Sequence, residues 1–502
     1  MGNAKDIVKP VIGLEIHVEL ATATKMFCRC RNRFGDPPNT NVCPVCIGMP
    51  GVLPVMNRRA VELAMKVGLA LNCAVADLTK WDRKSYYYPD LPKNYQISQY
   101  DLPLSVNGCL ETPLGDGSTK RVRILRAHLE EDAGKNIHDH PAHTGVDLNR
   151  AGVPLLEIVS EPDMNTVEEV MSFARAMHRL VRWLGASEAN MQMGHMRFEP
   201  NINLHITRGQ QTFKTPIVEV KNLNSFRALE RTVEYEIQRQ YDAWLENPEG
   251  YSLEKLGKQN RGYDDAREQT VFQREKEEAH DYRYFPEPDL VPVVVDEAWR
   301  ESIQATIGEL PLARRKRYME SYNLTFKEAD ALTQEAGSGD LLDAAVAAGA
   351  SPKRVANILL GQCAAIANRD DLTIFQAWSR KRPDKTLPEL AAPLTRVCEM
   401  IEIGTITPTA SANVVALVIE TGEDPDTIVD RKGWRAVKDS GTIEAWVEAA
   451  IAANPQAVAD VKEGGKKQKK AFGFLMGQVM QMSRGTAQPA EVQRLLQGKL
   501  DL

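Results

Sequence analysis

The chain has 502 residues, 43% hydrophobic and 26% charged, which is the composition of a folded protein too long for a single core. Its net charge of −6 excludes a generally basic nucleic-acid-binding protein, so any nucleic acid must bind to local basic patches. No run of about 18 apolar residues is present and the first residues lack an apolar signal core, so we expect a cytoplasmic protein without a membrane span.

The first predicted element is a strand over residues 11–20, in which apolar and polar side chains alternate. Every second residue from Leu14 is apolar, whereas Glu15, His17 and Glu19 fall on the other face. Such a polar face is typical of a solvated edge strand, but it can also form one part of a site. Carboxylates with one imidazole suit Mg²⁺ or Mn²⁺, and the pattern alone leaves both interpretations open.

Four of the eight cysteines form two close pairs, C-x-C followed by C-x-x-C, and this spacing predicts a zinc site. The expected ligands are Cys28, Cys30, Cys43 and Cys46. Four thiolates complete the coordination of the ion, so zinc would stabilise a loop and would not be catalytic. Free thiols and redox chemistry are the alternatives.

Aromatic and basic residues are interleaved around prolines over residues 82–96, which follow a predicted helix over 58–71. This composition can stack a base or line a polar channel, and it is equally typical of a packed loop with half-buried tyrosines. Lys84 is the candidate functional residue of this stretch.

Further acidic residues can complete a site with the first strand. Glu130 and Glu131 end a strand predicted over 121–131 and are followed by another acid, a glycine and a lysine, a set that can hold a cation and a phosphate together. Glu157 interrupts the apolar start of the segment 153–163, where a carboxylate is costly unless it is paired or coordinated. No phosphate-binding loop of the Walker type and no dinucleotide fingerprint occurs.

The spacing of apolar residues changes along the chain from a mixture of strand and helix patterns to a helical pattern. A capping box at Thr166 starts one helix, and further strands are predicted over 193–204 and 215–220. The β-containing part closes near residue 292. Beyond it the pattern is helical, most clearly over 352–366, 393–401, 442–453 and 471–482. We therefore predict an α+β fold, in which a β-rich N-terminal domain has a mixed sheet with flanking helices and precedes a mainly helical region.

Two basic segments interrupt the helical region, one over 380–385 and one that follows two glycines. The second segment contains Lys466, Lys467, Lys469 and Lys470. These lysines can bind a phosphate backbone, although a solvated loop is the usual meaning of such a run.

Taken together, the motifs closely resemble the B subunit of the aspartyl/glutamyl-tRNA amidotransferases, along essentially the whole chain. The segments that carry the resemblance are 11–20 (VIGLEIHVEL), 87–90 (YYPD), 129–135 (LEEDAGK), 156–163 (LEIVSEPD), 221–226 (KNLNSF), 281–289 (DYRYFPEPD) and 473–478 (GFLMGQ). The resemblance implies a catalytic cradle domain over 1–292, a helical domain over 293–408, and a helical tail domain over 409–502 that contacts tRNA.

The resemblance also implies an activity. Members of this family use ATP and Mg²⁺ to phosphorylate the side-chain carboxylate of Glu-tRNA(Gln) or Asp-tRNA(Asn), and ammonia then forms the amide. Ammonia comes from a partner amidase, the A subunit, while the small C subunit is the third member of the heterotrimer. The sequence does not say which misacylated tRNA is the substrate. A zinc-containing tRNA-binding scaffold without catalysis is the alternative.

Carried over to this chain, the family's Mg²⁺ ligands are Glu15, His17, Glu131 and Glu157, and Glu130 lies beside them. The resemblance implies catalytic roles for Glu131, Glu130 and Lys84, the last along an ammonia channel. Two segments depart from the family pattern: 191–199 lacks expected acids and a cysteine, and 380–385 is expected to be an insertion.

Overall fold

The computed structural model describes residues 6–140, 142–275, 282–437, 439–463 and 467–500, and Asp281 and Lys466 lie outside these ranges. The chain forms two compact units, Met1–Leu312 and Ala313–Leu502. The first unit contains the β-sheets and the second is helical, so the predicted α+β class is confirmed. The expected boundaries at residues 292 and 293 and at residues 408 and 409 stay predictions.

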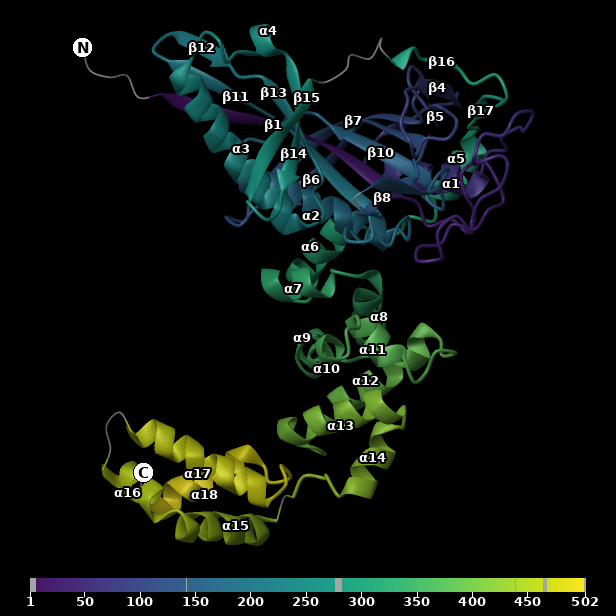
Figure 1. The fold of residues 1–502 in the computed structure, drawn as a ribbon. Coiled ribbons are helices and arrows are strands. Elements are labelled where there is room, and N and C mark those ends of the chain that lie inside the picture. The colour runs from purple at the N-terminus through teal and green to yellow at the C-terminus, as the bar shows by residue number, and fades with distance from the viewer. Residues whose placement is uncertain (1–5, 141, 276–281, 438, 464–466, 501–502) are drawn as a thin grey trace. The chain divides into compact units, whose positions relative to one another are not determined.

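Among the described residues, ten strands form the main sheet of the first unit, and most neighbours in it are antiparallel (Figure 1). These strands are β1 (Ile7–Glu19), β2 (Ala74–Val75), β6 (Ser105–Pro113), β7 (Thr119–Glu131), β10 (Pro154–Ser160), β11 (Met196–Arg208), β12 (Gln211–Lys214), β13 (Ile217–Lys221), β14 (Lys258–Asp264) and β15 (Gln269–Glu275). The order across the sheet is β15-β14-β13-β11-β1-β10-β7-β6-β2, and β12 pairs with β11. Because β13 and β14 are parallel, the sheet is mixed, as predicted.

Among the residues that the structure describes, smaller sheets and five helices complete the first unit. The small strands are β3 (Leu78–Thr79), β4 (Asp82–Ser85), β5 (Tyr95–Ser98), β8 (Lys135–His140), β9 (His143–Asp147), β16 (Phe285–Pro286) and β17 (Val293–Val294). The helices are α1 (Arg58–Ala70), α2 (Val167–Trp183), α3 (Phe226–Glu246), α4 (Leu253–Leu256) and α5 (Glu297–Gln304). Figure 1 shows α2 and α3 side by side along the sheet, and both pack into its apolar core.

The alternation predicted for the first strand is present in β1. Leu14, Ile16 and Val18 are fully buried in the core, and Glu15 and His17 are half-buried on the other face. Burying these three aliphatic side chains stabilises the fold by roughly 1.5–3 kcal/mol each. This apolar anchoring fixes which side chains of β1 face the polar side of the sheet.

The second unit is a succession of helices. They are α6 (Pro311–Ser321), α7 (Phe326–Leu332), α8 (Ala336–Ala347), α9 (Pro352–Ile358), a π-helical segment η2 (Leu359–Cys363), α10 (Ala364–Arg369), α11 (Ile374–Ser379), α12 (Leu387–Glu402), α13 (Pro408–Thr421), α14 (Pro425–Lys432), α15 (Ser440–Ala453), α16 (Pro455–Glu463), α17 (Gln468–Met482) and α18 (Pro489–Leu500). Apolar clusters within this unit span residues 318–429 and 443–500. No helix in the described ranges is long and apolar enough to cross a membrane.

Two of the predicted helices differ from the observed ones. The helix predicted over 352–366 runs on to Arg369 and contains the π-helical segment η2. The helix predicted over 393–401 begins earlier, at Leu387, because Thr386 and Glu389 form a capping box there and Pro393 is accommodated inside the helix.

Candidate active site and metal centre

The polar face of the main sheet places side chains from three strands in one row. His17 of β1 lies opposite Glu157 of β10, and Glu157 lies opposite His128 of β7. Residues that are directly opposite in paired strands face the same side, so these three side chains are neighbours. Glu130 lies two residues beyond His128 on the same face.

His17, Glu130 and Glu157 each offer a ligand atom within 4.8 Å of the others. The Nε2 of His17 is 3.5 Å from Oε2 of Glu157, and the Nε2 of His128 is 3.3 Å from Oε1 of Glu130. Glu130 is 2% exposed and Glu157 is 7% exposed. Two buried carboxylates and an imidazole are a suitable donor set for Mg²⁺ or Mn²⁺, and we refer to these three residues as the acid–histidine triad.

Charges within and beside the triad strongly perturb the pKa values of its members. Burial alone would lower the pKa of His17, but its hydrogen bond with Glu157 and the negative charge of Glu199 raise it to about 9. Burial alone would raise the pKa of Glu157, but the positive charges of His128 and His17 hold it well below its usual range. The carboxylate of Glu157 is therefore ionised at neutral pH, which metal coordination requires.

Lys84 approaches the triad from β4. Its Nζ lies 5.2 Å from the centre of the Tyr282 ring. Burial opposes its charge, but the negative charges of Glu130 and Glu157 raise its pKa well above the usual value. The negative charges of the two buried carboxylates therefore hold Lys84 in its ammonium form. Its place along an ammonia channel stays a prediction.

Glu131 lies outside the triad, although the resemblance implied that it is a ligand. Its carboxylate forms an ion pair with Lys93 and accepts a hydrogen bond of 2.9 Å from the Ile97 N–H. It borders a cavity of about 210 Å³ that Cys46 and Gly152 also line. Glu131 therefore ties the end of β7 to β5 and to the segment just before β5.

Glu15 belongs to a second group of acids, two residues along β1 from His17. Its ligand atom lies within 4.8 Å of those of Glu199 and Glu219. The Nζ of Lys221 is 2.8 Å from Glu199 Oε2 and 2.7 Å from Glu219 Oε1, so an ammonium already neutralises part of this group.

Sequence reasoning missed His128 and Arg126, which face the triad from β7. Their orientation depends on a β-bulge: Val159 pairs with Arg126, whereas Ser160 pairs with Ile124, which leaves Leu125 without a residue opposite in β10. The sequence carries a signal of this bulge, because the buried apolar positions change from 122 and 124 to 127 and 129.

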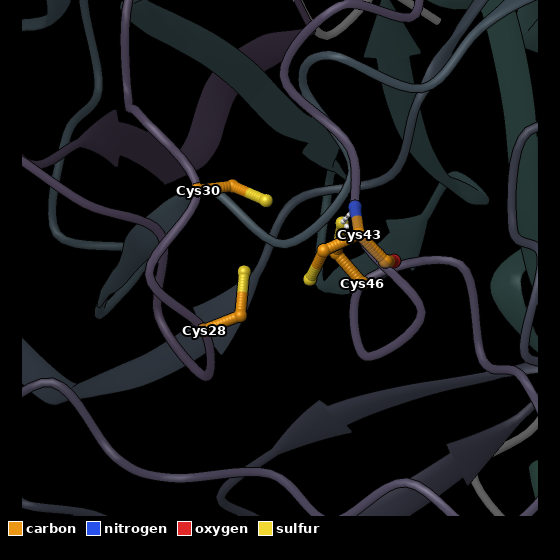
Figure 2. Close-up of side chains that lie close together, drawn as sticks. All are labelled: Cys28, Cys30, Cys43 and Cys46. Carbon is orange, nitrogen blue, oxygen red and sulfur yellow. Dashed lines mark hydrogen bonds between the residues drawn. The ribbon is translucent and has the colours of Figure 1, made fainter.

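The four predicted zinc ligands lie together. Their Sγ atoms are all within 4.8 Å of one another, and Figure 2 shows the side chains converging from two segments of one loop. Tetrahedral zinc with bonds of about 2.3 Å needs sulfur atoms about 3.8 Å apart, so small adjustments bring the group to that geometry. Soft thiolate donors fit zinc better than Mg²⁺. The group could therefore hold a structural zinc ion.

Local interactions favour the thiolate form of Cys46. The hydrogen bond from the Cys28 thiol lowers the pKa of Cys46 to about 4, although burial opposes it. The Cys43 N–H donates to the Cys46 sulfur at 3.1 Å, and the fully buried Lys25 ammonium lies 3.7 Å from the same atom. A thiolate is the form that binds a metal.

The lysines predicted to contact tRNA lie around the start of α17. Lys467, Lys469 and Lys470 are exposed. Lys466 lies outside the described residues. The role of these lysines stays a prediction.

Comparison with known proteins shows the family of the chain. Residues 10–301 match the family model described as GatB/GatE catalytic domain, and residues 340–500 match one described as GatB domain. Proteins named as the B subunits of aspartyl/glutamyl-tRNA(Asn/Gln) amidotransferases are 45% identical to the chain in Carboxydothermus hydrogenoformans, 44% in Halorhodospira halophila and 43% in Brevibacillus brevis. Each match covers 98% of both proteins.

Proposed function

The chain belongs to the B subunits of the aspartyl/glutamyl-tRNA(Asn/Gln) amidotransferases, and we propose that it carries the ATP-dependent step of this ligase. In that step the side-chain carboxylate of Glu-tRNA(Gln) or Asp-tRNA(Asn) attacks the γ-phosphorus of ATP. An acyl phosphate forms and ADP leaves. Ammonia then attacks the acyl carbon, phosphate departs, and the amide remains on the tRNA.

Within this proposal the acid–histidine triad binds Mg²⁺. A bound Mg²⁺ would offset negative charge on the phosphates of ATP. His17, Glu130 and Glu157 supply its protein ligands, and Glu15 contributes from the adjacent acidic group. Glu131 acts indirectly, because its contacts with Lys93 and the Ile97 N–H fix the end of the strand that carries Glu130.

The other parts of the proposed site have supporting roles. Lys84 lies beside the carboxylates of the triad and supplies a positive charge where ammonia would arrive. The four cysteines hold Zn²⁺ and stabilise the loop next to the triad-bearing strand. Lys466, Lys467, Lys469 and Lys470 contact the phosphate backbone of the tRNA, within a tail domain over 409–502. Ammonia is supplied by a partner amidase, the A subunit, while the small C subunit is the third member of the heterotrimer.

The convergence of His17, Glu130 and Glu157 from three strands is the single observation that carries this proposal. The test uses γ-labelled ATP and the reconstituted complex with each misacylated tRNA, following labelled acyl phosphate and the amide. Glu130→Gln should reduce both products at least about 100-fold, because a group next to the reacting phosphate is lost. Glu246→Gln, at the exposed end of α3, is the matched control and should be fully active.

Two outcomes distinguish the alternatives. Full activity of Glu130→Gln would contradict the proposed role of the triad. If the wild-type complex bound tRNA tightly yet transferred no label from ATP to either substrate, the chain would be a tRNA-binding scaffold.

A further inference from the structure

The β-bulge in β7 has a specific effect on the polar face. Before the bulge, Val122 and Ile124 point into the core; after it, Ala127 and Leu129 do so. The change of phase occurs at Leu125. On the other edge of β7 the register with β6 is unbroken, because Val106 pairs with Arg126 and Gly108 with Ile124. Asn107, which lies between these two residues of β6, has a φ of 56°. Regular alternation from Ile124 would have placed residue 126 in the core.

Arg126 is the first residue that the bulge turns toward the triad. Its Nη2 lies 3.9 Å from Oε1 of Glu157, which is longer than a hydrogen bond. Its Nε is buried and makes no hydrogen bond with any residue that the structure describes. The side chain is 32% exposed, so the guanidinium lies between the triad and solvent.

A structural ion pair with Glu157 does not by itself account for the position of Arg126. Glu157 already has His17 and His128 within 3.5 and 3.7 Å, so its charge is balanced without Arg126. A buried guanidinium N–H without a hydrogen-bond partner is costly, so a ligand that accepts from it would stabilise this side chain. The planar donors of arginine match the paired oxygens of a phosphate.

We propose that Arg126 binds the terminal phosphate of ATP at the solvent-facing edge of the triad. The inference rests on the proposed function and adds a nucleotide contact to it. Lys84 supplies a second positive charge close to the same carboxylates. The transferred phosphate would thus lie between a metal-binding group and two cationic side chains, the surroundings that phosphoryl transfer requires.

The test compares Arg126→Gln and Arg126→Lys with the wild type in the reconstituted complex. Two readouts are used: calorimetric binding of a non-hydrolysable ATP analogue with Mg²⁺, and steady-state KM values for ATP and for the misacylated tRNA. Loss of hydrogen bonds to a charged phosphate should weaken analogue binding and raise KM for ATP roughly 10- to 100-fold in Arg126→Gln. Arg126→Lys should recover part of this loss, and KM for tRNA should stay unchanged.

Arg121→Gln is the matched control, because Arg121 is exposed on the same strand before the bulge. It should bind the analogue like the wild type. Unchanged analogue affinity in a folded Arg126→Gln would overturn the inference, and so would a change confined to KM for tRNA. If Glu130→Gln transfers phosphate normally, the proposed function fails instead; if Glu130→Gln is inactive while Arg126→Gln binds the analogue normally, only the inference fails.

Discussion

The Nε2 of His17 lies 3.5 Å from the carboxylate of Glu157, directly across the pairing of β1 with β10. The two residues are 140 positions apart in the chain, yet strand register alone makes them neighbours. Each is surrounded by buried apolar residues of its own strand, which prevent the strands from sliding by one residue. The core of the sheet thus determines the geometry of the site.

His17→Ala should remove one ligand of the triad without disturbing the apolar side of β1, because Ile16 and Val18 keep their packing. We expect amidation to fall at least about 100-fold while the variant still assembles with its partner subunits. Amidation is measured with misacylated tRNA and excess Mg²⁺, and assembly by gel filtration. Normal amidation by this variant would exclude His17 from the site.

The cysteine group should bind about one zinc ion per chain. Replacing Cys43 and Cys46 by serine should abolish zinc binding and lower Tm, because the ion cross-links a loop with little core of its own. Metal content is measured by mass spectrometry and Tm by calorimetry. Cys109→Ser, at a cysteine outside the group, should retain the zinc; a zinc content of zero in the wild type would contradict the prediction.

Stability should depend on pH through Glu236, which is fully buried in α3. Burial alone would raise its pKa, but its hydrogen bonds with Arg239 and Thr270 hold the pKa below the usual value of 4.5. Because the folded pKa is lowered, the stabilisation is fully present above pH 4.5 and is lost as the pH falls through the folded pKa.

Glu236→Gln should therefore destabilise the protein by about 3–5 kcal/mol at pH 7, because it leaves the Arg239 charge without its buried partner. The difference from the wild type should shrink below pH 4.5. Urea unfolding of the whole chain at pH 7 and pH 4 measures both values. An equal difference at the two pH values would show that the charge of Glu236 is not the cause.

Replacing Lys467, Lys469 and Lys470 together by alanine should weaken tRNA binding and leave ATP binding unchanged. Removing each phosphate contact should reduce the slope of log affinity against log salt by roughly one. Filter binding across a salt series measures this slope. Lys432→Ala, an exposed lysine at the end of α14, is the control. An unchanged slope in the triple variant would remove these lysines from the tRNA contact.

Much of this architecture could be predicted from the sequence, because it follows from side-chain period and spacing. The alternation in residues 11–20 identified a strand with one polar face, and the isolated carboxylate of Glu157 indicated a partner. The spacing of the cysteines predicted a group that the fold brings together.

Other features depended on register, which the sequence does not display. Glu130 and Glu131 are adjacent acids, and only the pairing of β7 with β10 decides that Glu130 joins the triad. Arg126 and His128 were missed because a bulge inverts the alternation just before them. Glu15 shares a face with His17, but at the strand spacing of about 7 Å it meets a different group of acids.

The most direct test of the account is divalent-ion binding by the triad itself. Mn²⁺ binding to the purified chain, followed by electron paramagnetic resonance and competed with Mg²⁺, needs neither ATP nor tRNA. We predict that Glu130→Gln and Glu157→Gln lose a site that the wild type has, whereas Glu246→Gln retains it. Unchanged Mn²⁺ affinity in a folded Glu157→Gln variant would contradict the claim that these three residues form the metal site.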